Sequence, residues 1–241
     1  MLKIGIYGST GRMGKELSAA LAESSDCVLS YSYSRSSGGN IDDLCSSSDV
    51  IVDFSSAEAL CKLLPYVIKN RSKLVICSTG FSNEQMSEIE AASMQIPILQ
   101  AANTSFSVYL LSELVRKASS SLGNEYDVEI LDLHHRNKKD APSGTALTLG
   151  KVAAEARGDK FVADFHLDGK KKDASIGFAS IRGGEIFGEH HVMFLSGKDS
   201  ITLSHKSEGR RAYAEGAVEA AIWLALRSGP GLYSMKDVFE R

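Results

Sequence analysis

Two adjacent histidines open the loop whose residues are best suited to chemistry, HHRNKKDAPSGT at positions 134–145. The loop joins the end of an expected strand to the start of an expected helix. Neighbouring side chains at a strand end point to opposite sides, so His134 and His135 are not expected to serve the same contact. An imidazole can donate a proton near neutral pH, and we expect one histidine to do so while the other binds or orients a substrate. Surface histidines on a solvated loop are the alternative, which the residues that follow disfavour.

The residues that follow the histidines predict a site for an anion. Ser143 is a suitable helix cap, and the backbone N–H groups of Gly144 and Thr145 would be exposed at the start of the helix. Lys138 adds a positive charge within the same loop. Together these groups favour the binding of a carboxylate beside a proton donor.

A second group of residues, the turn GSTGRMG at positions 8–14, lies between the first expected strand and the first expected helix. Glycine permits a tight turn, a close approach of the backbone to a phosphate, and close packing of the helix on the strand. Near Gly8 and Gly11, the unpaired N–H groups of the helix would then face the pyrophosphate of a dinucleotide. An ordinary strand-to-helix turn is the alternative, because the spacing is G-x-x-G-x-x-G rather than G-x-G-x-x-G. The position at the first join of strand and helix favours a cofactor.

The end of the second expected strand bears on which dinucleotide is bound. An acid about 20 residues after the glycines would bind the ribose hydroxyls of NAD. This chain has Ser34 there, followed by Arg35 and Ser36. An arginine flanked by hydroxyls suits a 2′-phosphate, so we predict NADPH as the preferred cofactor, with NADH as the alternative. The competing interpretation of Arg35 is a solvated side chain on a surface loop.

The elements that must position these residues alternate in type up to about residue 104. Strand-like apolar runs occur at 2–7, 27–33, 49–54, 74–81 and 96–103. Helical segments lie between them, including one expected after the capping-box spacing Ser55–Glu58 and one over residues 83–94. This alternation predicts an α/β fold with an open parallel sheet of the Rossmann type.

After residue 104 the order of elements changes. We expect helices at 106–122, 143–156 and 211–226 and strand-like runs at 127–135, 176–182, 190–195 and 200–205. Strands joined without intervening helices predict a second, α+β domain with a mixed or antiparallel sheet. The expected division is a dinucleotide-binding domain of residues 1–104 and 214–241, and a second domain of residues 105–213.

The composition disfavours several classes of partner. The chain has 241 residues, a formal charge of −3 and no block of basic residues, so neither nucleic acid nor a membrane surface is expected as a partner. No run approaches the ~18 apolar residues of a membrane span. The four cysteines form no C-x-x-C pair, which indicates a reducing compartment. We therefore expect a cytoplasmic protein with a small-molecule ligand.

Three further segments are interpreted as structural. The sequence EHH at 189–191 enters an apolar strand and has no partner acid or cysteine at metal spacing, so no metal site is expected. The run KKK at 170–172 is expected to be a solvated loop, and the alternative is that it attracts an anionic substrate. The sequence RGG at 182–184 indicates a hinge or bulge, because paired glycines relax the backbone.

Blocks along essentially the whole chain resemble the dihydrodipicolinate reductase family. In order they are GSTGRMG, VDFS, STGF, AANTS, HHRNKKDAPSGTAL, IGFASIRGGEIFGEHHVMF and SHKSEGRRAYAEGA. The resemblance implies NAD(P)H-dependent reduction of 4-hydroxy-tetrahydrodipicolinate to tetrahydrodipicolinate in lysine and diaminopimelate biosynthesis. In that reaction hydride reaches ring carbon C4 after loss of water, and a proton is added at C3. The resemblance also implies an active site in a cleft between the domains and a homotetramer built by the second domain.

The same resemblance implies roles for individual residues. His134 is implied as the general acid, Lys138 as its assistant and a carboxylate ligand, and the other substrate contacts as His135, Ser143, Gly144 and Thr145. Cofactor contacts are expected at Gly8, Gly11, Arg12, Met13, Ser34, Arg35, Ser78, Thr79, Gly80, Ala101, Ala102 and Asn103. Two positions depart from the family: Ser34 stands where many members carry an acid, and Thr104 where some carry an aromatic side chain.

Two other functions compete with this one. Another small dehydrogenase, acting on an amino acid or a sugar, would share the first domain, and a redox sensor would bind NADP without catalysis. The combination of His134, Lys138 and the Ser-Gly-Thr cap disfavours both. A sensor needs neither a proton donor nor a carboxylate site.

Overall fold

The computed structural model of the chain describes residues 1–165, 170–172 and 174–240. Contacts between residues divide it into two compact units. The first comprises Met1–Phe106 and Arg210–Arg241, and the second comprises Ser107–Gly209. Each unit has its own sheet and its own apolar core.

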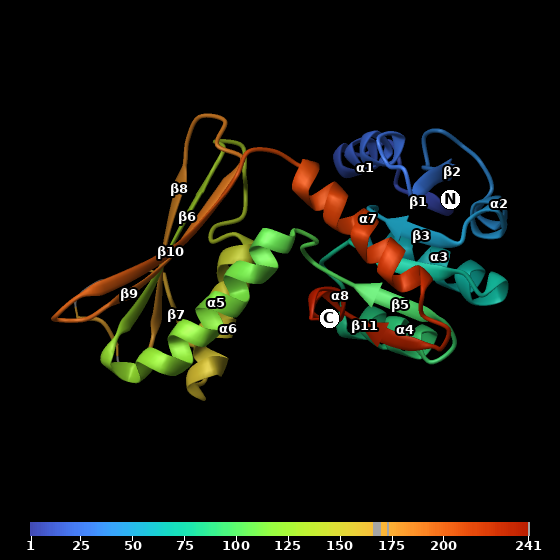
Figure 1. Cartoon of the computed structure of the whole chain (residues 1–241). Coiled ribbons are helices and arrows are strands. Elements are labelled where there is room, and N and C mark those ends of the chain that lie inside the picture. The colour runs from blue at the N-terminus through green and yellow to red at the C-terminus, as the bar shows by residue number, and fades with distance from the viewer. Residues whose placement is uncertain (166–169, 173, 241) are drawn as a thin grey trace. The chain divides into compact units, whose positions relative to one another are not determined.

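The first unit contains a six-stranded sheet in which every pair of neighbours is parallel (Figure 1). In spatial order its strands are β11 (Gly231–Tyr233), β5 (Pro97–Gln100), β4 (Lys73–Ile76), β3 (Val50–Asp53), β1 (Leu2–Tyr7) and β2 (Cys27–Tyr33). From β1 the chain first adds β2 on one side and then β3, β4 and β5 on the other. The sheet is therefore doubly wound, and the predicted Rossmann-type sheet is confirmed.

Helices cover both faces of this sheet. One apolar core joins the strands to α2 (Ile41–Ser47), α3 (Ala57–Asn70) and α4 (Asn83–Ser93). On the other side α1 (Arg12–Ala22) packs against α7 (Arg211–Ala225), which contacts β3 and β4, and α8 (Met235–Phe239) follows near the end of the chain. Because the sheet is covered on both faces, β3 and β4 contain the continuous apolar runs VIV and LVI.

Some details of this unit differ from the prediction. The cap of α3 is Ser56, whose hydroxyl accepts the Ala59 N–H, and not Ser55 as the capping-box spacing suggests. Ser55 is engaged elsewhere, because its hydroxyl and its N–H both donate to Asp53. The sequence also gave no signal for α2 and β11, which have 7 and 3 residues and so carry little periodicity.

The second unit contains a five-stranded mixed sheet with two helices on one face (Figure 1). In spatial order its strands are β10 (Ser200–Ser207), β9 (Gly188–Leu195), β6 (Asp127–His134), β8 (Ile176–Arg182) and β7 (Ala163–Asp164). The strands β6, β8 and β7 are parallel, whereas β9 is antiparallel to both of its neighbours. The predicted α+β unit with a mixed sheet is confirmed. The helices are α5 (Phe106–Leu122) and α6 (Gly144–Arg157), with a 3₁₀ turn, Gly123–Glu125, after α5.

Alternation along β6 decides which side chains face these helices. Val128 and Ile130 are buried in the core with α5 and α6, and Asp132 and His134 continue the same face toward the end of the strand. On β9, which is paired with β6, His190 is directly opposite Asp132. The helix-covered face of the sheet thus begins as an apolar core and ends in a buried polar cluster.

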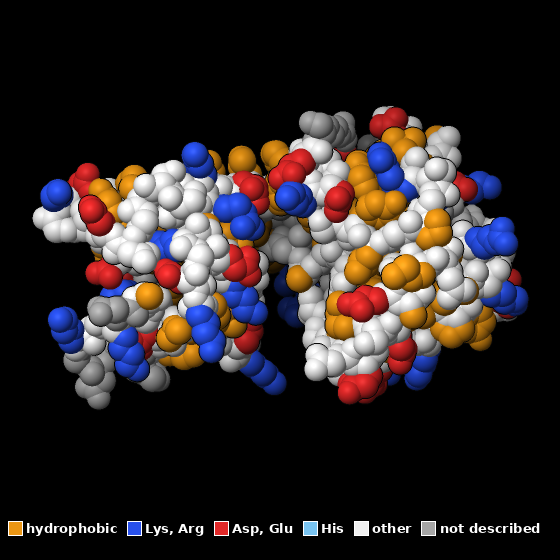
Figure 2. Space-filling model, turned by 90° about the horizontal axis from the view of Figure 1, so that it is seen from below, with side chains coloured by type: hydrophobic (Ala, Val, Ile, Leu, Met, Phe, Trp, Pro, Cys, Tyr) orange, Lys and Arg blue, Asp and Glu red, His pale blue; other side chains and the backbone are white. Residues whose placement is uncertain are grey.

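Charged side chains of both signs are interspersed on the face shown in Figure 2. The Lys170–Lys172 run was predicted to be solvated, but one of its three side chains, Lys171, is not. The Lys171 ammonium donates to Val128 O and pairs with Glu129, so it is bound to β6. Among the described residues, no helix is both long and apolar enough to cross a membrane.

Candidate functional site

The predicted cofactor residues lie where the strands of the first sheet end. They follow β1 (Gly8), β2 (Ser34 and Arg35), β4 (Ser78, Thr79 and Gly80) and β5 (Ala101, Ala102 and Asn103). Because all strands are parallel, their carboxyl ends meet at one edge of the sheet. Backbone hydrogen bonds join these ends: the Gly8 N–H donates to Tyr33 O (2.8 Å) and the Ala101 N–H to Ile76 O (2.9 Å). The structure therefore brings these residues to the edge where open α/β sheets bind ligands.

The glycine turn has the backbone geometry of an anion site. Gly8 has a φ of +94°, and a Cβ atom there would lie 2.8 Å from a backbone oxygen. A Cβ atom on Gly14 would lie 2.4 Å from Gly8 O, so only glycine lets α1 start this close to the strand. Gly11 is the N-cap of α1 and offers no side-chain cap to the first turn, which contains Arg12 and Met13. The turn thus fits the pyrophosphate of a dinucleotide.

A cavity of about 300 Å³ lies beside the glycine turn. Its walls combine three aromatic rings with four of the predicted residues: Tyr7, Tyr33 and Phe54 with Gly8, Gly11, Ser34 and Arg35. The rings of Tyr7 and Tyr33 are stacked, with centroids 5.0 Å apart. Burial raises the pKa of Tyr7 to about 12, so its hydroxyl stays protonated and donates to Ala59 O. An apolar wall beside an anion site suits a nucleotide.

Hydroxyl groups surround Arg35 at the end of β2. Ser34 Oγ lies 2.7 Å from Ser37 Oγ and 3.2 Å from Ser36 Oγ, which is 3.2 Å from Thr10 Oγ1. Ser34 is buried, whereas Arg35 is exposed, and both line the cavity. Donors and a guanidinium therefore occupy the position at which an acid would bind free ribose hydroxyls.

A further buried polar residue of this edge, Asp53, is absent from the predicted set. It ends β3, is fully buried and accepts hydrogen bonds from the Ser55 N–H, the Ser55 hydroxyl and the Ser78 hydroxyl. Burial raises the pKa of its carboxyl, against the effect of these hydrogen bonds. Asp53 thus joins a cavity residue to a predicted cofactor contact. A charged side chain at the end of the apolar run VIVD was the available signal.

In the second unit His134 lies beside a buried carboxylate. His134 is the last residue of β6 and is 8% exposed, and its Nδ1 atom is 3.0 Å from Asp132 Oδ2. The ring is not aligned for a regular hydrogen bond with that oxygen. Arg182 Nη2 lies 3.1 Å from the same oxygen, and the Ser180 hydroxyl donates to Oδ1 (2.5 Å). Asp132 therefore links the predicted proton donor to β8.

Ser143 lies in the same buried cluster. As predicted, it caps α6, because its hydroxyl accepts the Ala146 N–H. Its own N–H donates to Asp132 Oδ2 (3.2 Å), and its Oγ atom is 3.1 Å from His190 Nε2. The ring of His190 makes an edge contact with the ring of His134, at a centroid distance of 5.2 Å.

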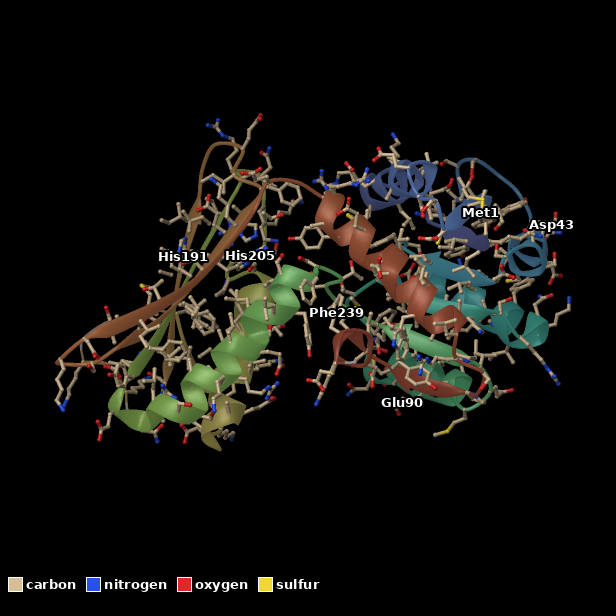
Figure 3. The ribbon with its side chains drawn as sticks, viewed as in Figure 1. Met1, Asp43, Glu90, His191, His205 and Phe239 are labelled. Atoms are coloured by element: carbon tan, nitrogen blue, oxygen red, sulfur yellow. The ribbon has the colours of Figure 1, made fainter. Side chains whose placement is uncertain are left out.

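The row of imidazoles continues onto β10. His205 stacks on His190 with centroids 6.3 Å apart. Its Nε2 atom lies 3.1 Å from Ser107 Oγ, at the start of α5. Figure 3 labels His205 on this sheet. His134, His190 and His205 thus occupy three neighbouring strands on one face of the sheet.

Burial controls the charge of this cluster. It lowers the pKa of His134, and the positive charges of Lys138 and Arg182 lower it further, whereas Asp132 raises it. Burial also lowers the pKa of His190, to about 4. Both rings are therefore neutral at pH 7 in this state. An anion bound nearby would favour protonation of His134.

The remaining predicted substrate residues surround this cluster less tightly. Lys138 Nζ is 3.0 Å from Asp140 Oδ2, in the loop between β6 and α6. His135 is half-buried just after β6, Gly144 is exposed and Thr145 is half-buried in the first turn of α6. Ser143 and His134 are thus brought together around Asp132, while His135 lies outside that buried contact.

Comparison with known proteins agrees with this architecture. The family model described as dihydrodipicolinate reductase, N-terminus, matches residues 2–104, and that described as dihydrodipicolinate reductase, C-terminus, matches residues 107–239. The chain belongs to the dihydrodipicolinate reductase family.

Relatives within this family match over nearly their full length. The 4-hydroxy-tetrahydrodipicolinate reductase of Zymomonas mobilis is 43% identical over 98% of this chain and 96% of that protein. That of Rickettsia akari is 41% identical over 100% of this chain and 97% of that protein. The solved dipicolinate-bound dihydrodipicolinate reductase from Paenisporosarcina sp. TG-14 has a TM-score of 0.80 over 97% of both chains at 21% identity, so it has the same fold.

In this member of the family, Asp132, His134 and His190 also have the side-chain types of a metal site. One candidate ligand atom from each lies within 4.8 Å of the others. However, Arg182 already contacts Asp132, and the charge of Lys138 acts on both histidines. This positive surrounding opposes a further cation and favours an anion.

Several members of the cluster escaped the sequence prediction. From the sequence, Arg182 was considered only for the two glycines that follow it. His190 was considered only as part of EHH, and the two histidines of that segment face opposite sides of β9. Asp132 could have been found from the alternation of β6, because it shares a face with His134 two residues later. Arg182 and His190 could not, because strand pairing alone brings β8 and β9 beside β6.

Proposed function

We propose that this chain reduces 4-hydroxy-tetrahydrodipicolinate to tetrahydrodipicolinate with NAD(P)H, in the biosynthesis of lysine and diaminopimelate. The observation that carries the proposal is the identity of 43% to a protein named 4-hydroxy-tetrahydrodipicolinate reductase, over nearly the whole of both chains. The loop that resembles the family's most specific block also contains a buried histidine and a capped helix start, and the carboxylate of Asp132, from the preceding strand, lies beside that histidine.

The substrate is a cyclic dicarboxylate, and the second unit offers groups for its carboxylates. The first turn of α6 presents the N–H groups of Gly144 and Thr145, and the helix dipole adds positive potential there. Lys138 supplies a full charge once a substrate carboxylate replaces Asp140 as its partner. His135 and Ser143 complete the proposed contacts. The related protein from Paenisporosarcina was solved with dipicolinate, a planar molecule with the same two carboxylates.

His134 is proposed to deliver the proton to C3 of the substrate. In the free protein its pKa is lowered by burial and by Lys138. A carboxylate bound at Lys138 offsets that charge, so substrate binding raises the pKa of His134 and loads the acid with its proton. The proton donor is thus charged when there is a substrate to receive the proton.

The residues of the first unit are proposed to hold the nicotinamide dinucleotide, which supplies a hydride to C4 when bound. The glycine turn would bind the pyrophosphate through backbone N–H groups. The absence of Cβ atoms at Gly8 and Gly14 allows the tight backbone that this requires. Ser78 to Gly80 and Ala101 to Asn103, which follow the neighbouring strands β4 and β5, would contact the nicotinamide side.

NADPH is proposed as the preferred cofactor. Arg35 and the hydroxyls of Ser34, Ser36 and Thr10 supply donors and positive charge for a 2′-phosphate. Paired kcat/KM values for NADPH and NADH test this preference, and a substantial preference for NADH would contradict it.

The reaction itself is tested by mixing the purified protein with NADPH, pyruvate, aspartate semialdehyde and the upstream synthase. The absorbance of the reduced nicotinamide should fall only when all components are present. No loss at saturating cofactor would overturn the proposal. Oxidation driven by an amino acid or a sugar alone would instead favour another dehydrogenase, and cofactor binding without turnover would favour a redox sensor.

A homotetramer is proposed as the working state, in the cytoplasm. The face of the second sheet opposite α5 and α6 carries apolar side chains at alternate positions of β6, β8 and β9: Leu131, Leu133, Ile181, Met193 and Leu195. Ile181 is 48% exposed and Leu195 36% exposed, which is costly in water and typical of a surface that another subunit covers. Light scattering coupled to size-exclusion chromatography measures the number of subunits. A monomer at micromolar concentration would contradict the tetramer.

The cleft between the two domains, expected to hold both ligands, stays a prediction.

A further inference from the structure

The carboxylate of Asp132 is unusual in its position. It is the third-last residue of β6, two residues before His134, and its side chain is fully buried. Burial of an ionised carboxylate is costly unless charged partners and hydrogen bonds compensate. An apolar residue would continue the face begun by Val128 and Ile130 at no such cost. A function is therefore a better explanation of Asp132 than stability.

The partners of Asp132 come from β6, from β8 and from the start of α6. Oδ2 receives the Ser143 N–H at 3.2 Å, contacts Arg182 Nη2 at 3.1 Å and lies 3.0 Å from His134 Nδ1. Oδ1 accepts the Ser180 hydroxyl. Burial opposes ionisation, but the hydrogen bond from Ser180 and the charge of Arg182 hold the pKa of Asp132 below its usual value. The group is thus a carboxylate at neutral pH.

We propose that Asp132 is a positioning residue of the reduction: it holds Nδ1 of His134, so that Nε2 is the nitrogen that transfers the proton, and it ties this ring to the first turn of α6. The inference rests on the proposed function. The charge of the carboxylate, 3.0 Å from Nδ1, favours the neutral tautomer that carries its proton on Nδ1, although the ring is tilted away from a regular hydrogen bond in the free protein. The same Oδ2 atom holds the Ser143 N–H, so the acid and the proposed carboxylate site share one anchor.

The space around the ring supports this orientation. On β9, a Cβ atom at Gly188 would lie 3.1 Å from His134 Nε2 and 3.3 Å from Cδ2. The absence of a side chain at Gly188 therefore leaves room for the ring in the orientation that Asp132 holds. His190 closes the adjoining side by its edge contact with the ring.

The charges that face His134 determine what the loss of Asp132 should do. Asp132 itself comes from β6, Lys138 from the following loop, Arg182 from β8 and His190 from β9. Asp132 is the one anion in this set, and it favours protonation of His134, whereas Lys138 and Arg182 oppose it. Loss of that anion therefore lowers the pKa of His134.

The test is Asp132→Asn, which keeps the size of the side chain and removes its charge. We expect kcat at pH 7 to fall ~10- to 100-fold, as part of the general-acid contribution is lost, with a smaller change in KM. The descending limb of the kcat–pH profile should also move to lower pH. The matched control is Asp127→Asn, an exposed carboxylate on the same strand, which should behave as the wild type.

A purely structural role for Asp132 would not move the pH limb. Unchanged kcat and an unchanged limb in Asp132→Asn, with an active wild type, would overturn the inference and leave the proposed function intact. An inactive wild type would instead refute the proposed function.

A second measurement needs neither the variant nor the substrate, and so it holds if Asp132→Asn does not fold. The ¹⁵N shifts of His134 in the wild type, assigned by their loss in His134→Gln, report which ring nitrogen carries the proton. The neutral ring should be protonated at Nδ1. A neutral ring protonated at Nε2 would overturn the inference.

Discussion

The glycine turn of the first unit and the histidine cluster of the second are proposed to bind anions by opposite means. The turn uses backbone N–H groups and the absence of side chains at Gly8 and Gly14. The cluster uses buried side chains whose charges depend on one another, with Asp132 at the centre. Binding at a site made of backbone groups should be weakened by an added Cβ atom, and it should not depend on pH in the neutral range, because backbone amides do not titrate there. A site made of coupled side chains should respond to pH and to single changes of charge.

The largest effect is expected at the histidine cluster. His134→Gln should lower kcat by ~10²- to 10⁴-fold, because glutamine cannot supply the proton, while KM changes little. Steady-state kinetics in the coupled assay measure both values. His191→Gln, on the opposite face of β9, is the matched control. A kcat within twofold of the wild type would remove His134 from the reaction.

The second effect tests the backbone site. Gly14→Ala should weaken cofactor binding and destabilise the first unit by ~1–3 kcal/mol, because the added Cβ would lie 2.4 Å from Gly8 O. Gly229→Ala, where a Cβ atom meets nothing within 4 Å, is the control. Calorimetric titration with NADPH and thermal unfolding provide the measurements. Equal affinity and stability in both variants would show that the turn tolerates a side chain.

The third effect separates the two cofactors. Arg35→Ala should reduce kcat/KM for NADPH by ~10-fold or more and that for NADH much less, because a charge-assisted contact to the 2′-phosphate contributes ~1.5–3 kcal/mol. Arg116→Ala, an exposed arginine on α5, is the control. Equal losses with both cofactors would assign Arg35 a role other than recognition of the 2′-phosphate.

The fourth effect is a pH shift that sharpens the contrast between the sites. His134 is proposed to act as an acid, so kcat/KM should fall as pH rises through its free-state pKa, which burial and Lys138 hold below its usual value. Lys138→Ala should lower kcat, and it should also move this limb to higher pH, because one cause of the lowered pKa is gone. The direction is opposite to that expected for Asp132→Asn. Lys139→Ala, its exposed neighbour, should leave the limb in place, and a limb unmoved by Lys138→Ala would show that Lys138 does not act on His134.

Local patterns predicted most of the elements. The strands at 2–7 and 27–33 and the helix at 106–122 have the expected bounds, because each has a clear apolar period between turn signals. The predicted cap of α3 was wrong by one residue. Ser55 and Ser56 have the same side chain, and Ser56 becomes the cap because Ser55 is hydrogen-bonded to the buried Asp53. Short elements such as α2 and β11 were missed because few residues carry no period.

The sequence by itself determined the fold class, the family and the two loops in which the chemistry is expected, because each of these depends on residues close together in the chain. It also placed His134 and Ser143 in one block. Only the tertiary structure decided that Asp132 joins them, that Arg182 and His190 complete the cluster, and that Asp53 links two strand ends. These contacts arise from the pairing of β6 with β8 and β9 and of β3 with β4. Strand pairing brings together residues that are distant in the chain, such as Asp132 and Arg182, which are 50 positions apart, and no local spacing records it.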